Sequence, residues 1–86
     1  MAANISLNNI KDIGGIVRYH RQQANLSRLS LAEISGVGKT AVYDIENGKE
    51  SVKINTLVKV LKTLNISLEL KSPIMENYDG KKNEKS

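Results

Sequence analysis

The chain has 86 residues and a formal net charge of +4. A chain this short forms one small domain that buries too little surface to be very stable alone, so we expect a partner chain to contribute stability. The absence of cysteine excludes disulfide bonds and thiolate metal sites, and His20, the single histidine, cannot build a zinc site. Residues 1–10 have neither a basic head nor a long apolar run, and no segment approaches membrane-spanning length. We therefore expect a cytoplasmic location and no membrane partner.

The positive charge lies mainly in one part of the chain. Residues 51–71 contain four lysines and one acidic residue, whereas residues 72–86 contain three basic and three acidic residues. This balance suits an anionic partner such as nucleic acid, whose phosphates make binding fall steeply with salt. Mild basicity is also common in small soluble proteins, so charge alone identifies no partner.

Residues 1–8 are predicted to form an N-terminal arm, followed by a helix from about Asn9 to Ala24. Asn9 offers a capping oxygen, and Asn25 is suited to end the helix because asparagine tolerates the left-handed conformation. The apolar residues of this segment repeat at helical spacing: Ile10, Ile13, Val17 and Ala24.

Two adjacent glycines interrupt this predicted helix. Each glycine costs roughly 1 kcal/mol relative to alanine in a helix interior. Gly14 and Gly15 should therefore have a packing reason, and we expect close approach of another helix there.

Residues 26–48 have the spacing of two short helices that cross tightly. Ser27 is a suitable N-cap for a helix from about Arg28 to Ser35. Ala32 is small enough for the next helix to approach this one without a clash. Gly36 can adopt the positive φ that a sharp turn between helices requires.

The next helix is predicted from about Lys39 to Glu46, and the turn residues Asn47 and Gly48 end it. Val42 points back into the core, which leaves the opposite face of this helix free. An exposed helix after such a turn has the dimensions to enter a DNA major groove. We therefore predict a helix-turn-helix motif for DNA binding, with this segment as its recognition helix.

Residues 36–40, GVGKT, match part of a nucleotide-binding P-loop but do not complete it. The motif needs a glycine five residues before Gly38, where this chain has Glu33, and a P-loop follows a strand rather than a helix. His20 has no credible catalytic partners. We predict no enzyme activity, no catalytic residue, no cofactor and no metal.

A last helix is predicted from about Ile54 to Leu64, which completes a domain over residues 9–65. Its lysines, Lys53, Lys59 and Lys62, are expected mostly on the solvent side. Its apolar stripe is predicted to be Ile54, Leu57, Val58, Leu61 and Leu64.

The pattern then changes to alternation of apolar and polar residues from Ile66 to Lys71, which is typical of a strand with one buried face. A lone strand leaves its backbone donors and acceptors unpaired, so it needs another strand. The simplest source is the same segment of a second copy, paired antiparallel about a two-fold axis. We therefore predict a homodimer formed through residues 66–72 and a disordered tail over 73–86. The predicted dimer contacts are Ile66, Leu68 and Leu70.

Residues 26–48 resemble the Cro/C1-type (XRE) helix-turn-helix family of bacterial and phage regulators. The residues that carry the resemblance are Ala32, Gly36, Val42 and the closing Ile45-Glu46-Asn47-Gly48. It extends over most of the chain through further matching positions: Gly14, Arg18, Arg21, Leu57, Leu61 and Leu64. The last helix, which runs directly into residues 66–71, also resembles HipB-type antitoxins. Gly38 stands where the family usually has a Ser or Thr cap.

The resemblance implies an all-α, lambda-repressor-like bundle of four to five helices, with a C-terminal β-strand that pairs across a dimer. It implies a sequence-specific repressor that binds a palindromic operator in double-stranded DNA. The HipB-like subgroup implies an antitoxin that represses its own toxin–antitoxin operon and binds a HipA-type kinase toxin. The alternatives are a stand-alone or phage-type repressor, and a protein-interaction module that only holds a partner.

Four residues of the predicted recognition helix are candidates for base contacts by their position in the family pattern: Lys39, Thr40, Tyr43 and Asp44. A lysine donates to guanine and a threonine methyl contacts thymine, whereas Asp44 needs a cytosine amine or a neighbouring cation. Tyr43 suits the sugar–phosphate edge equally well. A merely solvated helix face is also polar, so the framework and not the polarity favours DNA contact.

Three further residues are candidates for phosphate contacts: Ser27, Arg28 and Lys49. Arg28 and Lys49 are otherwise solubilising surface charges. The resemblance also implies a semi-buried ion pair of Arg21 with Glu46, which joins the first helix to the recognition helix. Leu29 and Ile34 stand where the family is usually polar, and they form either a patch for a protein partner or the edge of the core.

Overall fold

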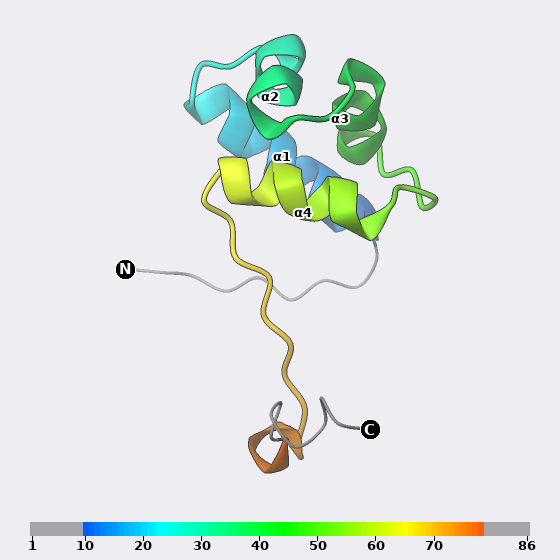
Figure 1. The fold of residues 1–86 in the computed structure, drawn as a ribbon, viewed down its shortest axis with the longest axis vertical. Coiled ribbons are helices and arrows are strands. Elements are labelled where there is room, and N and C mark those ends of the chain that lie inside the picture. Colours follow the sequence, from blue (N-terminus) through cyan, green and yellow to red (C-terminus); the bar gives the residue numbers. More distant parts are fainter. Residues whose placement is uncertain (1–9, 79–86) are drawn as a thin grey trace.

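The computed structural model of the protein describes residues 10–78, of which residues 10–65 form an all-α bundle. Helix α3 packs against α1, α2 and α4, and α2 also packs against α4 (Figure 1). None of the helices in this range is long and apolar enough to cross a membrane. The bounds are α1 Ile10–Gln23, α2 Arg28–Ser35, α3 Lys39–Glu46, α4 Ile54–Thr63 and a 3-10 helix, η1, at Met75–Asn77. The predicted arm, the predicted cap Asn9 and residues 79–86 lie outside the described part of the chain.

The four α-helices within residues 10–78 end in the same backbone motif. After each helix the N–H of one residue donates to the carbonyl five residues earlier, as from Leu26 to Arg21 at 3.1 Å and from Ile66 to Leu61 at 2.9 Å. This is the Schellman motif, which satisfies carbonyl groups that a helix end leaves without partners. The residues with positive φ are Asn25 (57°), Gly36 (74°), Gly48 (75°) and Asn65 (59°). Local turn chemistry therefore closes each helix, as predicted for Asn25, Gly36 and Gly48.

The helix starts are less uniform than the helix ends. The Oγ of Ser27 accepts a hydrogen bond from the backbone N–H of Ser30 at 3.0 Å, so Ser27 caps α2 as predicted. Gly38 precedes α3 and Lys53 precedes α4 without a side-chain cap. The start of α3 therefore depends on the tight turn after α2 and on the burial of its inner face.

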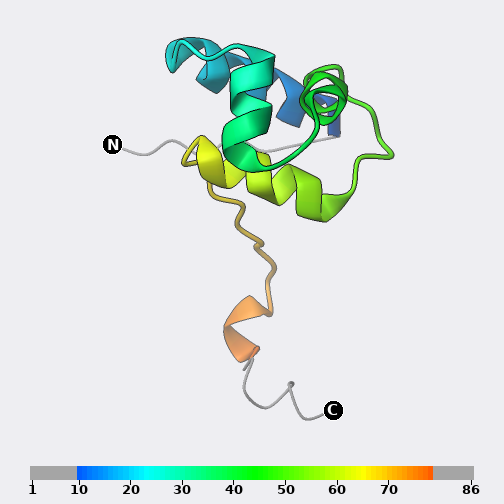
Figure 2. The same cartoon turned by 45° about the horizontal axis from the view of Figure 1, so that its top comes forward.

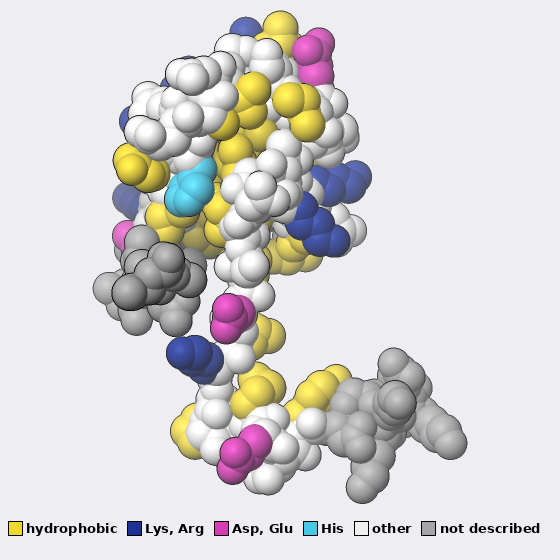
Figure 3. All heavy atoms as spheres, turned by 90° about the vertical axis from the view of Figure 1, so that its left-hand side faces the viewer, with side chains coloured by type: hydrophobic (Ala, Val, Ile, Leu, Met, Phe, Trp, Pro, Cys, Tyr) yellow, Lys and Arg dark blue, Asp and Glu magenta, His cyan; other side chains and the backbone are white. Residues whose placement is uncertain are grey.

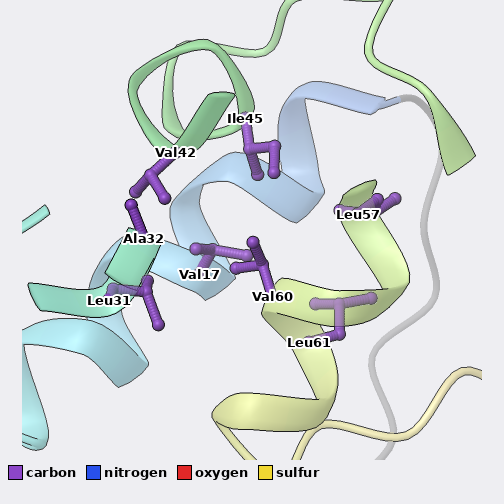
Figure 4. Close-up of a cluster of buried hydrophobic side chains, with 8 residues drawn as sticks. All are labelled: Val17, Leu31, Ala32, Val42, Ile45, Leu57, Val60 and Leu61. Atoms are coloured by element: carbon purple, nitrogen blue, oxygen red, sulfur yellow. The ribbon is translucent and has the colours of Figure 1, made fainter. Parts of the chain in front are cut away.

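All four α-helices contribute to one hydrophobic core (Figure 4). Ala32 is 1% exposed and Val42 is fully buried, which confirms the close crossing of α2 and α3 predicted from their spacing. Ala24 was expected on the apolar face of the first helix, but it is exposed because it follows the last residue of α1. The buried core residues are Val17, Leu31, Ala32, Val42, Ile45, Leu57, Val60 and Leu61.

Gly14 marks the closest contact between α1 and α3. A Cβ atom at Gly14 would lie 2.6 Å from the carbonyl oxygen of Ile45 and 2.7 Å from that of Glu46. The expected packing reason thus applies to Gly14. For Gly15 the expectation is wrong, because this residue faces solvent and an added Cβ would meet nothing within 4 Å.

The buried face of α4 differs in part from the predicted stripe. Leu57 and Leu61 are buried as predicted, but Val60 is fully buried and Ile54 is 64% exposed. Together with Leu64, which packs against the core, the buried residues have the i, i+3, i+4, i+7 spacing of one helix face. The helix is therefore rotated relative to the prediction. Its lysines are exposed, as predicted.

Residues 66–72 leave the domain and run away from α3 (Figures 1 and 2). Ile66 packs against the core of its own chain, whereas Leu68 is 49% exposed and Leu70 is 84% exposed. Residues 10–78 contain no assigned strand, because a strand is defined by pairing and the single chain supplies no second strand here. The strand and its dimer pairing stay predictions. Helix η1 occupies part of the segment predicted as a disordered tail.

Candidate nucleic-acid interface

Helix α3 has one buried face and one exposed face. Val42 and Ile45 anchor the inner face in the core. On the outer face lie the four candidates for base contacts: Lys39, Thr40 and Tyr43, which are exposed, and Asp44, which is half-buried. In both ribbon views this helix lies on the part of the domain away from the segment 66–72 (Figures 1 and 2). The structure therefore brings the four candidates together on one accessible surface.

Asp44 has a cation beside it from its own chain. The Nζ of Lys49 lies 3.5 Å from Oδ2 of Asp44, and 58% of the Lys49 side chain is exposed. Exposed ion pairs of this kind contribute only about 0–1 kcal/mol. Lys49 therefore reduces the negative charge on the outer face of α3 while it remains available to a phosphate.

Glu46, at the end of α3, is the one buried charged residue in the described part of the chain. Its carboxylate accepts hydrogen bonds from Arg21 Nε at 2.6 Å and from Arg21 Nη2 at 3.2 Å. Such two-pronged pairs are among the strongest side-chain hydrogen bonds. Arg21 Nη1 also donates to the carbonyl of Leu26 at 2.8 Å. One guanidinium thus joins α1 to the end of α3, as the resemblance implied, and it also holds the turn after α1.

Two more arginines reach the same carboxylate. Arg28 Nε donates to Oε1 of Glu46 at 3.0 Å, and Arg18 Nε lies 3.6 Å from that oxygen. The Arg28 guanidinium also lies over the ring of Tyr43, with Cζ 5.5 Å from the ring centroid. The sequence predicted Arg28 as a candidate for a phosphate contact but did not predict these two contacts. The local signal is the i, i+3 spacing of Tyr43 and Glu46, which places both on one side of α3.

Burial of the Glu46 carboxyl raises its pKa, but the hydrogen bonds and positive charges of Arg21 and Arg28 lower it by more. The net pKa of Glu46 therefore lies below its ordinary value. The carboxyl is ionised at neutral pH, and its negative charge offsets one of the surrounding positive charges.

Leu29 and Ile34 are both exposed on α2, at 49% and 63%. The expectation that they belong to the edge of the core is therefore wrong, and the patch for a protein partner stays a prediction. Figure 3 shows further hydrophobic side chains at the surface around His20. Leu29 and Ile34 belong to α2 and not to the outer face of α3.

His20 has a structural environment. Its Nδ1 lies 2.7 Å from the carbonyl oxygen of Ile16, one turn earlier in α1, and its ring meets the edge of Tyr19. Within residues 10–78 no group of three His, Cys, Asp or Glu side chains is placed to hold a metal ion.

The comparisons with known proteins agree with this geometry. A family model described as helix-turn-helix matches residues 17–71. An uncharacterized HTH-type transcriptional regulator, y4mF of Sinorhizobium fredii, is 39% identical over 62 residues, which cover 72% of this chain and 82% of the relative. The control protein C.SmaI of Serratia marcescens is 37% identical over 83 residues, which cover 95% of this chain and 94% of the relative.

A solved structure titled as a HipA–HipB–O2–O3 complex contains a chain with the same fold. The TM-score is 0.73 at 20% sequence identity, and the match covers 81% of this chain and 99% of that one. At this identity the likeness shows the fold alone. The family match spans more than half of the sequence. The chain therefore belongs to the helix-turn-helix family of the XRE type.

Proposed function

We propose that this protein is a transcriptional repressor that binds double-stranded DNA sequence-specifically, as a homodimer on a palindromic operator. The observation that carries the proposal is the exposed outer face of α3, which the buried Val42 and Ile45 hold outward. A B-DNA major groove, about 12 Å wide, accepts a helix presented in this way. The family match and the two regulators similar in sequence support the proposal.

The base contacts are proposed for the outer face of α3. Lys39 is the first residue of α3, and we assign to it a hydrogen bond to guanine. To the methyl group of Thr40 we assign a contact with a thymine methyl. Tyr43 lies one turn further along, beside Arg28. Asp44 accepts from a cytosine amine, and Lys49 reduces its repulsion from the phosphates.

Phosphate contacts flank this helix. Arg28 at the start of α2 and Lys49 after α3 supply positive charge on either side of the recognition helix. The hydroxyl of Ser27 already caps α2, so we assign its phosphate contact to its backbone N–H. These contacts fix the register of α3 but carry no sequence information themselves.

The homodimer is proposed to form by antiparallel pairing of residues 66–72 from two copies. Leu68 and Leu70 are exposed in the single chain, and a second copy is the simplest partner for them. Ile66 contributes from its place at the edge of the core. The two recognition helices then meet successive major grooves, with half-site centres about 34 Å apart or a multiple of that.

The decisive experiment for DNA binding is selection of duplexes from a randomised pool by the purified protein. We expect enrichment of a palindrome whose binding weakens steeply as salt is raised. Failure to enrich any sequence would overturn the repressor and favour a module that only holds a protein partner.

Sedimentation tests the dimer. Leu68→Pro removes a backbone donor from the proposed strand pair and should convert the dimer to a monomer. Leu68→Val keeps both the donor and the apolar side chain, and should remain dimeric. A Leu68→Pro protein that sediments as the wild type does would contradict the pairing.

A second candidate function is a HipB-like antitoxin that also binds a HipA-type kinase toxin. The observation that favours it is the fold match to a chain of the HipA–HipB complex, which covers 99% of that chain. The alternative is a stand-alone or phage-type repressor, and the sequence similarity to the control protein C.SmaI over 95% of this chain is compatible with it. A neighbouring reading frame for a HipA-like kinase whose product co-elutes with this protein would support the antitoxin. A neighbourhood without such a frame would contradict it.

A further inference from the structure

The guanidinium of Arg28 is held on one edge and open on the other. Its Nε donates a hydrogen bond to Glu46, and the Arg28 side chain makes no second hydrogen bond within residues 10–78. A guanidinium has five N–H donors in a fixed plane, so a bond through Nε sets the direction of the Nη donors. The side chain is 36% exposed. Donors of Arg28 are therefore both oriented and accessible to an outside acceptor.

Tyr43 restrains the same group from a second direction. The Arg28 Cζ lies 5.5 Å from the centroid of the Tyr43 ring, which is 53% exposed on the outer face of α3. A side chain fixed in this way loses less rotamer freedom when it binds a ligand than a mobile arginine does. The geometry thus pre-organises Arg28 beside the surface proposed to read bases.

The cluster around Glu46 has an excess of positive charge, which favours binding of an anion. Three arginines, Arg18, Arg21 and Arg28, share one carboxylate, which leaves two positive charges without a partner in this cluster. The Arg21 side chain is 11% exposed and is committed to Glu46 and Leu26. Arg28 lies next to α3 and at the first position of α2, where the helix dipole also favours an anion.

From this arrangement we infer that Glu46 is a positioning residue for DNA binding, and that it aims the free donors of Arg28 at a phosphodiester of the strand beside the groove entered by α3. The inference rests on the proposed function. In this inference the Glu46 carboxylate does more than join α1 to α3. Arg28, which Glu46 positions, would contact the phosphate and also lies over Tyr43, so phosphate contact and base reading by Tyr43 would both depend on Arg28.

The test uses the duplex that the wild-type protein selects from a randomised pool. Arg28→Lys keeps the charge but has one ammonium group in place of separate Nε and Nη donors, so it cannot bind Glu46 and a phosphate in the fixed geometry of a guanidinium. It should bind DNA about tenfold more weakly at unchanged salt dependence. Arg28→Gln should bind at least as weakly and reduce the salt slope by about one. Lys59→Gln, which removes an exposed charge on α4, is the matched control and should change affinity less than about twofold.

Glu46→Gln connects the two residues in a double-mutant cycle. If Glu46 acts through Arg28, Glu46→Gln weakens binding in the wild-type background and has little further effect in the Arg28→Gln background. Equal losses in both backgrounds would mean a structural role only and would overturn the inference. All affinities are measured below the melting transition of each variant, which circular dichroism follows.

Arginine side-chain NMR keeps the inference testable if Glu46→Gln does not fold. In the wild-type protein the Arg28 Nε–H should stay protected with and without the duplex, while rotation of its Nη groups slows when the duplex is added. Unchanged Arg28 signals, or wild-type affinity for Arg28→Lys, would overturn the inference and leave the repressor standing. Failure of the wild-type protein to select a duplex would overturn both.

Discussion

The helical domain, residues 10–65, and the C-terminal segment, residues 66–78, differ in how far contacts within the chain satisfy their polar groups and bury their apolar side chains. In the domain, turn motifs close every helix end, and no buried side-chain nitrogen or oxygen lacks a partner within the described residues. In the segment, Leu68, Leu70 and Ile74 are exposed. Contacts within one chain therefore shape the surface proposed to read DNA, whereas the proposed pairing of residues 66–72 would require a second copy.

The largest expected effect is in the domain. Glu46→Ala leaves Arg21 and Arg28 without their shared carboxylate, and breaking a buried ion pair from one side costs about 3–5 kcal/mol. We expect the melting temperature to fall by roughly 15 °C or more, measured by circular dichroism. An unchanged melting temperature would mean that the ion-pair cluster does not stabilise the domain.

The two neighbouring glycines of α1 provide a matched pair. Gly14→Ala places a methyl group against the backbone carbonyls of α3 and should destabilise the domain by about 1–3 kcal/mol. Gly15→Ala meets open space and should stabilise it by about 0.5–1 kcal/mol. Denaturant unfolding measures both. Similar effects of the two substitutions would contradict the close approach of α1 to α3 at Gly14.

Acid should act on the domain through Glu46. Because its folded-state pKa is depressed, its contribution to stability is complete above its pKa in the unfolded chain and is lost as the pH falls through the lower folded-state pKa. Unfolding free energies of the wild type and Glu46→Gln should therefore converge as the pH falls below about 4. A constant difference across this range would show that the charge of Glu46 is not the source of its effect.

The smallest expected effect on the domain comes from the segment. Leu70→Ser changes a side chain that is 84% exposed in the single chain, so at low protein concentration unfolding of the domain should change by less than about 0.5 kcal/mol. Dimerisation, followed by sedimentation, should weaken. A large loss of domain stability in the monomer would show that the segment belongs to the domain.

Sequence was most informative where a structure depends on neighbouring residues. The bounds of α2 and α3 follow from the Ser27 cap and the Gly36 turn, and the ends of α1 and α4 differ from the prediction by one residue. The buried side of α4 was harder to predict. Its apolar residues are numerous enough to form two alternative stripes, and packing against the rest of the core selected the one that contains Val60.

In the candidate site, too, features set by residues close in sequence could be predicted, and contacts between different helices could not. The outer face of α3 could be predicted because Val42 identifies the inner face by helical spacing. The contacts of Arg28 with Tyr43 and Glu46 could not, because these residues come from different helices and meet only after α2 has turned onto α3. The proposed pairing of residues 66–72 would depend on a second molecule, and the spacing of residues within one chain gives only indirect information about it.

The most direct test of the account locates α3 on bound DNA. The chain has no cysteine, so Gly38→Cys, at an exposed position just before α3 with an ordinary φ of −74°, can carry a single DNA-cleaving iron chelate. On the selected palindrome we predict two cleavage clusters, one in each half-site, separated by about one helical turn or a multiple of that. The same reagent at Lys62→Cys, on α4, should give weak and diffuse cleavage. Diffuse cleavage from position 38 together with sharp cleavage from position 62 would contradict the assignment of α3 as the recognition helix.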